Sequence, residues 1–233
     1  MKAVILAGGL GTRLKPFTEI IPKPLLPIGE KSVLEIQIER LRQNGFDEIY
    51  LATNYMSDYI SNFLGDGSRY GVKIRISKED KPLGTVGPLT LLKDKLTEPF
   101  LVMNGDVLTL LNFKQFYDFS LKKNSVLSIT IKELVTPFRF GNIFFNGDYV
   151  TAIEEKPKIR TNILAGVYIF TPEIFKYIPE NEKYDMDRLI EKLLMEKIPI
   201  TKFDIREYWL DIGQIDDYEQ AQEIYKNHFA ESK

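Results

Sequence analysis

The chain alternates between short apolar runs and longer segments in which apolar residues recur every three or four positions. Three runs, residues 3–7, 49–52 and 100–103, are too short for ordinary helices and are typical of fully buried strands. Residues 72–76 alternate between apolar and polar positions, as a half-exposed strand does. The longer periodic segments predict helices over residues 32–44, 57–64, 85–96 and 113–123.

The first predicted helix carries clear signals at both of its ends. Ser32 can cap the helix, and Glu35 stands three residues later, as in a capping box. Gly45 follows the last periodic position and ends the helix. Strands and helices thus alternate through the first half, which predicts βαβ units.

This alternation predicts an α/β fold, with a Rossmann-like, mostly parallel mixed sheet flanked by helices. In such sheets ligands bind beyond the carboxyl ends of the strands. From residue 126 the pattern changes to strands at 126–132, 142–145, 149–153 and 164–170, followed by helices at 187–195 and 216–229. Asn146-Gly147 is a hairpin signal. We expect a single domain with two halves, residues 1–125 and a β-rich half, 126–233.

The first apolar run breaks into a glycine-rich loop, Gly8-Gly9-Leu10-Gly11-Thr12-Arg13-Leu14. The glycines let the backbone turn tightly and approach a ligand closely. Backbone N–H groups, with Arg13 as a fixed positive fork, suit a phosphate chain. The loop has Leu14 where a dinucleotide fingerprint needs Gly or Ala, and it lacks the Gly-Lys-Ser/Thr of a Walker loop. A tight turn without a ligand is the alternative.

Three charged side chains can add chemistry to this loop. Lys23 lies between Pro22 and Pro24, which hold it on a stiff segment, although a solvated lysine is the ordinary alternative. Asp106 follows the run 100–103, at a strand tip, and Asp211 also emerges from apolar surroundings. Two converging carboxylates can hold Mg²⁺, which neutralises a triphosphate. Each aspartate alone could instead be a turn or cap residue.

The amino-acid composition narrows the classes of protein to which this chain can belong. The 233 residues carry a net charge of -2 and no basic tract, so we expect no nucleic-acid partner. The absence of cysteine excludes disulfides and thiolate catalysis and fits a reducing cytoplasm. The single histidine, His228, argues against histidine triads and multi-histidine metal sites. The N-terminal stretch is neither a signal peptide nor a membrane span, so we expect a cytoplasmic protein with no membrane partner.

Two motifs that follow one another in the chain resemble the signature of the sugar-1-phosphate nucleotidyltransferases, also called nucleoside-diphosphate-sugar pyrophosphorylases. The motifs are Gly-Gly-x-Gly-Thr-Arg-Leu and, after it, Pro-Lys-Pro-Leu-x-Pro. The resemblance spans nearly the whole chain and implies the nucleotide-diphospho-sugar transferase fold with a smaller sugar-binding lobe. It implies that Arg13, Lys23 and Asp106 are catalytic, and that Asp106 and Asp211 are the metal ligands. The nucleotide-binding residues it implies are Leu6, Ala7, Gly8, Gly9, Gly11, Thr12, Arg13, Lys23, Glu79, Gly84, Thr85, Asn104 and Gly105.

Later segments resemble the substrate-binding elements of this family. Residues 82–89 resemble a segment of the mannose-1-phosphate guanylyltransferase branch that lies along the base, with Val86 in place of Ala. Glu79 could accept both N1–H and the exocyclic amine of guanine, although a solvated glutamate is the alternative. Residues 64–71 instead resemble compact uridylyltransferases that act on amino-sugar phosphates. The expected sugar-phosphate-binding residues are Gly141, Glu155, Lys156, Asn162 and Gly166.

The remaining polar residues near this lobe are given ordinary roles. We expect Arg139 and Arg160 to be solvated and Asp187 to cap a helix. Since the sequence ends soon after residues 216–229, we expect no activity of the kind that some family members house in a C-terminal β-helix.

The resemblance implies transfer of a nucleoside monophosphate from a nucleoside triphosphate, with GTP preferred, to a mannose- or heptose-like sugar 1-phosphate. Alternatives are uridylyl or thymidylyl transfer to a hexose or amino-sugar 1-phosphate, and a regulatory subunit without activity. A glycosyltransferase is a further alternative, because Asp185-Met186-Asp187 has the Asp-x-Asp spacing of such enzymes. A homo-oligomer is compatible with all of these.

Overall fold

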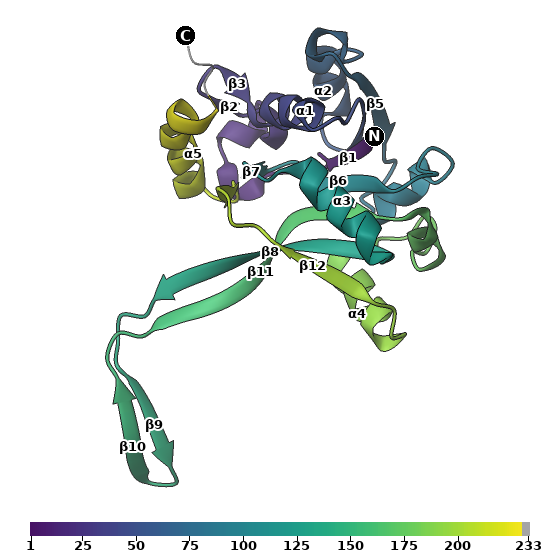
Figure 1. Cartoon of the computed structure of the whole chain (residues 1–233). Helices are drawn as coiled ribbons and strands as arrows, with labels where there is room; N and C mark the ends of the chain where they lie inside the picture. The colour runs from purple at the N-terminus through teal and green to yellow at the C-terminus, as the bar shows by residue number, and fades with distance from the viewer. Residues whose placement is uncertain (230–233) are drawn as a thin grey trace.

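A seven-stranded sheet forms the centre of the molecule, as the computed structural model of residues 1–229 shows (Figure 1). The strands lie in the order β12-β8-β11-β6-β1-β4-β5. Among these described strands only β11 is antiparallel to its neighbours. Their bounds are β1 (Lys2–Leu6), β4 (Glu48–Thr53), β5 (Lys73–Lys78), β6 (Phe100–Asn104), β8 (Leu127–Pro137), β11 (Lys158–Phe170) and β12 (Ile200–Asp204). The predicted mostly parallel mixed sheet is confirmed.

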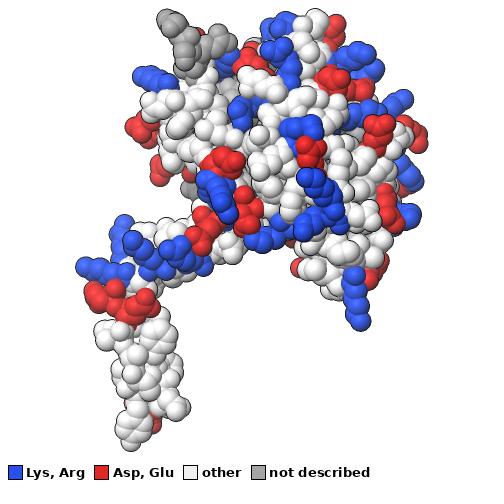
Figure 2. Space-filling model, in the orientation of Figure 1, with Lys and Arg blue, Asp and Glu red and all other residues white. Residues whose placement is uncertain are grey.

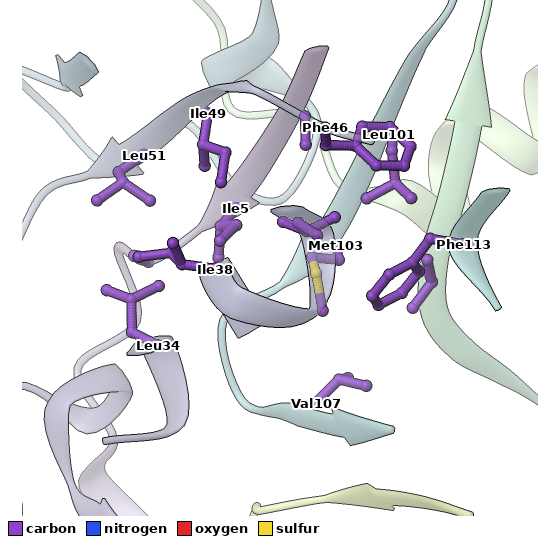
Figure 3. Close-up of a cluster of buried hydrophobic side chains, with 14 of the residues drawn as sticks. Ile5, Leu34, Ile38, Phe46, Ile49, Leu51, Leu101, Met103, Val107 and Phe113 are labelled. Carbon is purple, nitrogen blue, oxygen red and sulfur yellow. The ribbon is translucent and has the colours of Figure 1, made fainter. Parts of the chain in front are cut away.

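Helices cover both faces of this sheet because its central strands are apolar on both sides. Successive side chains of β1 point to opposite faces, so Ile5 packs in the cluster with α1 (Val33–Gln43), α2 (Ser57–Leu64) and α3 (Phe113–Lys123). Figure 3 shows Ile5 beside Leu34 and Ile38 of α1. Val4 packs in the opposite cluster, with α4 (Met186–Met195).

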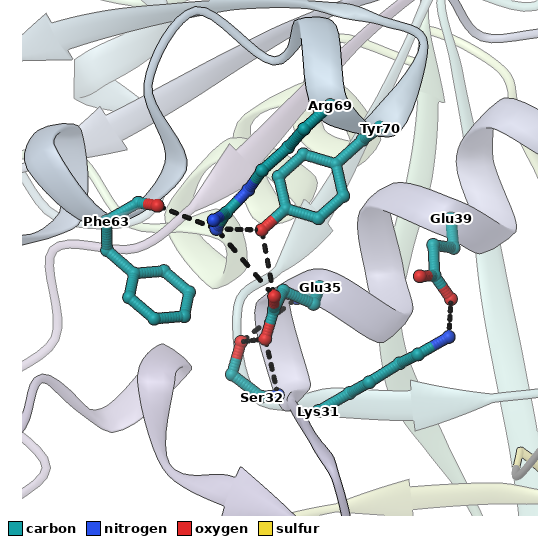
Figure 4. A network of polar contacts seen from close by, with 7 residues as sticks. All are labelled: Lys31, Ser32, Glu35, Glu39, Phe63, Arg69 and Tyr70. Carbon is teal, nitrogen blue, oxygen red and sulfur yellow. Dashed lines mark hydrogen bonds and ion pairs between the residues drawn. The ribbon is translucent and has the colours of Figure 1, made fainter.

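The start of α1 is fixed by the predicted capping box, which the structure confirms. Glu35 N–H donates to Ser32 Oγ over 3.2 Å, and Ser32 N–H donates to Glu35 Oε2 over 2.8 Å. The same carboxylate accepts from the Tyr70 hydroxyl over 2.9 Å and lies 3.8 Å from Arg69 (Figure 4). Tyr70 and Arg69 belong to the short 3-10 helix η4 (Ser68–Tyr70), so the network joins η4 to α1. The predicted bounds of α2 and α3 are also confirmed.

Two local predictions are wrong. Residues 85–96 were expected to form a helix, but the structure has only the 3-10 helix η5 (Gly87–Leu92). The N–H groups of Val86 and Gly87 both donate to Tyr184 O, at 3.0 and 3.1 Å, so a tertiary contact dictates the backbone here. Asp187 was expected to cap α4, whereas Asp185 occupies the N-cap position and Asp187 lies in the first turn.

A second, smaller layer packs beside the carboxyl ends of the central strands. It comprises α5 (Ile215–His228) and two short two-stranded sheets, β2 with β3 and β7 with β13. The strand bounds are β2 (Pro27–Ile28), β3 (Lys31–Ser32), β7 (Val107–Thr109) and β13 (Trp209–Asp211). Ala221 and Tyr225 of α5 are buried against this layer.

The second half adds strands to the sheet as expected, but its hairpin lies apart from the sheet. β9 (Asn142–Asn146) and β10 (Tyr149–Glu154) pair only with each other, and β8 and β11 extend beyond the body to carry them (Figure 1). We call residues 133–162 the arm and the rest of the described chain the body. Four further 3-10 helices are η1 (Thr12–Leu14), η2 (Phe17–Glu19), η3 (Lys23–Leu25) and η6 (Pro172–Lys176). None of the helices within residues 1–229 has the length and apolar character needed to cross a membrane.

Candidate active site

Two adjoining pockets lie where β1 and β6 end. Leu6 and Asn104 are in register, so the glycine loop after β1 and the turn after β6 begin at the same edge of the sheet. We call the first the cationic pocket; it is lined by Leu6, Gly9, Gly11, Thr12, Arg13, Lys23, Pro24, Gly105, Asp106 and Gly213. The second, the apolar pocket, is lined by Leu6, Gly8, Gly9, Ala52, Asn54, Glu79, Pro82, Gly84, Thr85, Pro88, Asn104 and Asp106.

The glycine loop forms one wall of the cationic pocket. Gly11 has a φ of 61°, and a Cβ there would lie 2.8 Å from Thr18 Cγ2, so glycine is required. The Thr18 hydroxyl donates to Gly11 O over 2.8 Å and fixes this turn. Arg13 is exposed and makes no hydrogen bond or ion pair within residues 1–229. Its guanidinium is therefore available to an anion in the pocket.

Lys23 and Asp106 form an ion pair at the centre of the pocket. The Lys23 ammonium donates to Asp106 Oδ2, and the two side chains are only 11% and 25% exposed. Asp106 Oδ1 is buried and has no hydrogen-bond partner within the described chain. One oxygen of this carboxylate is thus left for a further cation.

Asp211 approaches Asp106 through the pairing of β13 with β7. Asp211 is in register with Val107, and Ile212 N–H donates to Asp106 O over 3.0 Å. One side of Asp211 remains exposed, yet the surrounding protein raises the pKa of its carboxyl to about 6. Burial contributes most to this rise, followed by the negative charge of Asp106, while Lys23 acts in the opposite direction. The pairing of β13 with β7 therefore brings Asp211 next to the turn that carries Asp106.

These two carboxylates fit a magnesium ion. Mg²⁺ usually binds one or two carboxylates and keeps several waters or phosphate oxygens, so a larger cluster is not required. Within residues 1–229 no group of three or more acidic, histidine or cysteine side chains is placed to hold a metal. The unpartnered Asp106 Oδ1 and the neighbouring Asp211 carboxylate are the oxygen ligands that the site offers.

Gln37 supports the turn that carries Asp106, a role that no motif in the sequence indicates. The Gln37 amide donates to Asn104 O over 3.0 Å and to Val107 O over 2.8 Å, from the buried face of α1. It thereby clamps the backbone on both sides of Asp106. A polar residue between Leu34 and Leu41 on an otherwise apolar helix face was the signal available in the sequence.

Glu79 is the acidic group of the apolar pocket. It is only 6% exposed, and its Oε2 accepts the Leu83 N–H over 2.8 Å. Burial raises the pKa of this carboxyl, and the Leu83 hydrogen bond partly offsets the rise. Oε1 accepts no hydrogen bond within residues 1–229 and lies 3.2 Å from where a Gly8 Cβ would be. Glu79 is thus not a solvated surface residue, and one of its oxygens is free to accept from a ligand.

The loop over this pocket is anchored to the start of α4. Thr85 N–H donates to Asp185 Oδ1 over 3.1 Å, and Met186 N–H donates to Thr85 Oγ1 over 2.8 Å. Asp187 Oδ1 accepts the Arg188 N–H over 2.9 Å. The Asp-x-Asp spacing at residues 185–187 is thereby explained by hydrogen bonds to the backbone.

The predicted nucleotide-binding residues gather around the two pockets, with one exception. Ala7 is buried and lines neither of them.

The expected sugar-phosphate-binding residues lie in two separate places, one residue in the body and four on the arm. Gly166 has a φ of 71° and lies against the Asn104 side chain, 2.8 Å from where its Cβ would be. Four others lie on the arm, away from both pockets: Gly141, Glu155, Lys156 and Asn162.

Arg160 and Arg139 also lie on the exposed arm. Arg160 pairs with Glu133 over 2.7 Å, and both side chains are exposed. Arg139 makes no hydrogen bond or ion pair within residues 1–229.

Comparison with known proteins identifies the family. A family model described as nucleotidyl transferase matches residues 2–228, so this chain belongs to the nucleotidyl transferase family. It is 36% identical to the UTP–glucose-1-phosphate uridylyltransferase of Synechocystis sp., over 95% of this chain and 62% of that protein. It is 35% identical to the mannose-1-phosphate guanyltransferase of Saccharomyces cerevisiae, over 99% of this chain and 66% of that protein. The chain therefore spans less than two thirds of the length of these relatives.

The fold of this chain is similar to that of a solved structure. HddC from Yersinia pseudotuberculosis, complexed with GMP-PN, superposes with a TM-score of 0.74 at 31% identity, over 96% of this chain and 99% of that one. The resemblance to sugar-1-phosphate nucleotidyltransferases that the motifs indicate is confirmed at the level of family and fold.

Proposed function

We propose that this chain transfers a nucleoside monophosphate from a nucleoside triphosphate, with GTP preferred, to a mannose- or heptose-like sugar 1-phosphate. The products are a nucleoside-diphosphate sugar and pyrophosphate. The observation that carries the proposal is the cationic pocket, which Arg13, Lys23 and Asp106 line at one strand edge, with Asp211 on β13 beside the turn that carries Asp106.

The reaction requires positioning and charge neutralisation rather than a covalent nucleophile. An oxygen of the sugar 1-phosphate forms a bond to the α-phosphorus while the bond to the oxygen bridging the β-phosphorus breaks, and pyrophosphate leaves. Arg13 and the backbone N–H groups of the glycine loop bind the departing phosphates. Lys23, held by Asp106, places its ammonium beside the reacting phosphate. A magnesium ion held by Asp106 and Asp211 would neutralise charge on the triphosphate.

The preference for GTP rests on Glu79. Its free Oε1 and its Oε2 can accept the N1–H and exocyclic amine of guanine, whereas uracil and thymine offer a single imide N–H. The guanyltransferase relative supports this choice. The uridylyltransferase relative, at similar identity, supports the second candidate, uridylyl or thymidylyl transfer to a hexose or amino-sugar 1-phosphate.

We assign the sugar phosphate to the arm residues and Gly166. Lys156 binds the phosphate of the acceptor, and Glu155 accepts from sugar hydroxyls, with Gly141, Asn162 and Gly166 around the sugar ring. Polar groups that become buried against the bound sugar and pair with its hydroxyls are the means by which such sites discriminate among sugars. The cysteine-free sequence supports a reducing compartment, the cytoplasm, as the place of action.

The test is a matrix of GTP, UTP, dTTP, ATP and CTP against several sugar 1-phosphates, with Mg²⁺, in which pyrophosphate release is measured. We expect the highest kcat/KM with GTP and mannose or heptose 1-phosphate. A preference for UTP or dTTP would show that Glu79 does not select guanine, while the proposed nucleotidyl transfer would still hold. No release with any pair would overturn the proposed function.

A further inference from the structure

The arm makes no polar contact with its own body. Within residues 1–229 the only ion pair made by arm residues joins Arg160 to Glu133, and both belong to the arm. The Phe138 N–H likewise donates to Pro157 O, within the arm, over 2.9 Å. Figure 1 shows the arm projecting away from the body, with β9 and β10 at its far end. The arm is therefore free to meet another molecule.

The hairpin at the end of the arm is apolar on both of its faces. Phe144 and Phe145 are adjacent on β9, so their side chains point to opposite sides. Phe145 is 73% exposed and Tyr149, on β10, is 81% exposed. Figure 2 shows this hairpin as a largely uncharged surface beyond a charged neck. A lone two-stranded hairpin is marginally stable in water, and exposed apolar patches mark interaction surfaces.

The arm also carries the proposed phosphate-binding lysine far from the pockets of its own body. Gly166 contacts Asn104 at the apolar pocket, whereas Lys158 lies eight residues back along β11. At about 3.3 Å per residue, the separation between Gly166 and Lys158 along the strand is on the order of 25 Å. Lys156 lies still farther from Gly166 along the chain. Lys156 has a φ of 48°, which gives it a defined backbone conformation next to Glu155.

The arm cannot fold back without losing its pairing. The ladder between β8 and β11 is unbroken from Lys158 paired with Pro137 to Leu164 paired with Ile131, and its one shift in register lies inside the body. A return of Lys156 to its own pocket requires a bend in this ladder and the loss of hydrogen bonds. A second copy can accept the arm with the ladder intact.

The body carries exposed apolar residues on and just after the glycine loop, which lines the cationic pocket. Leu10 of the glycine loop is 57% exposed, and Ile20, just after η2, is 74% exposed. Phe17 lies between them in sequence, is also exposed, and contacts the Tyr218 ring of α5 at 5.8 Å. Exposed apolar residues thus lie on and just after the glycine loop of the pocket that lacks the arm's lysine.

Resting on the function proposed above, we propose that two copies of this chain form a two-fold dimer with exchanged arms. The hairpin of each copy packs on the exposed apolar residues Leu10, Phe17 and Ile20 of the other. Lys156 and Glu155 of each copy then complete the sugar-phosphate site beside Asp106 of the other copy. Such an interface uses the same two surfaces twice and closes at two subunits.

The test is complementation between two inactive variants. Lys156→Met has a defective arm and Asp106→Asn a defective body; each is expected to be inactive alone. The two are co-expressed with different affinity tags and purified through both tags, so that only mixed dimers remain. In a mixed dimer one composite site has both intact residues, so about half of the wild-type activity per dimer is expected. Lys158→Ala, an exposed neighbour on the arm, is the matched control and should stay active.

Three outcomes would overturn the exchange of arms. These are mixed dimers without activity, failure to recover any mixed dimer, and full activity of Lys156→Met alone. Pyrophosphate release by the wild-type protein is measured first. An inactive wild type would contradict the proposed function, and this result is distinct from the three outcomes above.

A second variant keeps the proposal falsifiable if Lys156→Met misfolds. Tyr149→Asp alters only an exposed tip and should give a monomer by light scattering, with at least a tenfold loss of activity and retained GTP binding. A dimer with unchanged activity would contradict the proposal.

Discussion

At the scale of single residues, Asp106 shows how the site balances its charge. Lys23 satisfies one carboxylate oxygen, and the other is buried without a partner in the described chain. A buried acceptor without a hydrogen bond costs about 1–3 kcal/mol, which a bound cation can recover. The Gln37 amide prevents the turn from relaxing to relieve this cost, because it holds the backbone on both sides of Asp106. The local structure therefore holds the Asp106 turn in place with one carboxylate oxygen unsatisfied.

Glu79→Gln is the residue change that tests how the base is chosen. Replacing the carboxylate removes one of two acceptors for guanine and introduces a donor that faces N–H groups. Hydrogen bonds to charged groups contribute about 1.5–3 kcal/mol, so kcat/KM for GTP should fall by about 10- to 100-fold, while kcat/KM for UTP should change little.

Steady-state kinetics with both triphosphates measure this change. Asp80→Asn, at the exposed neighbouring position, is the control and should leave both values unaltered. An equal loss with GTP and UTP would mean that Glu79 holds the loop rather than the base.

At the scale of elements, the helix ends follow local signals. The predicted bounds of α2 and α3 agree with the structure because their caps and periodicity lie within the helices themselves. The strands β7 and β13 were not predicted, because Trp209 finds its partner Thr109 only in the folded molecule. The same reason explains η5, whose backbone is held by Tyr184 from the other half of the chain.

Glu35→Gln tests the contribution of the capping network to stability. Burial alone would raise the pKa of Glu35, but hydrogen bonds from Ser32 and Tyr70 and the charge of Arg69 outweigh it and lower the pKa below 4.5. A lowered pKa means stability that is present above 4.5 and lost as the pH falls through the folded-state value. The variant should lose about 1 kcal/mol of unfolding free energy at neutral pH.

Urea unfolding at neutral and acidic pH measures this difference. The gap between wild type and variant should narrow as the pH falls below 4.5, because the wild-type carboxylate becomes protonated. Glu30→Gln changes an exposed neighbour and should match wild type at both pH values. If the difference in unfolding free energy between wild type and variant did not change with pH, the loss of stability would come from packing and not from the charge of Glu35.

At the scale of the whole molecule, the sheet brings distant residues to one edge. The positions of Asp106 and the glycine loop could be predicted, because parallel strands present their carboxyl ends together. The approach of Asp211 was inferred from its surroundings and family motif, and the structure explains it through β13. The direction of the arm could not be predicted, since its strands are recognisable in the sequence but no local signal specifies where the hairpin β9–β10 lies.

The measurement that tests the central claim most directly is pyrophosphate release by Asp106→Asn and Asp211→Asn with GTP, mannose 1-phosphate and Mg²⁺. Each variant should lose about a thousandfold in kcat, because it removes a carboxylate that would hold the magnesium ion at the triphosphate. Both should keep the wild-type circular dichroism and melting temperature. Asp187→Asn, an exposed control, should stay within about twofold of wild type. Wild-type rates in both Asp106→Asn and Asp211→Asn would contradict the account.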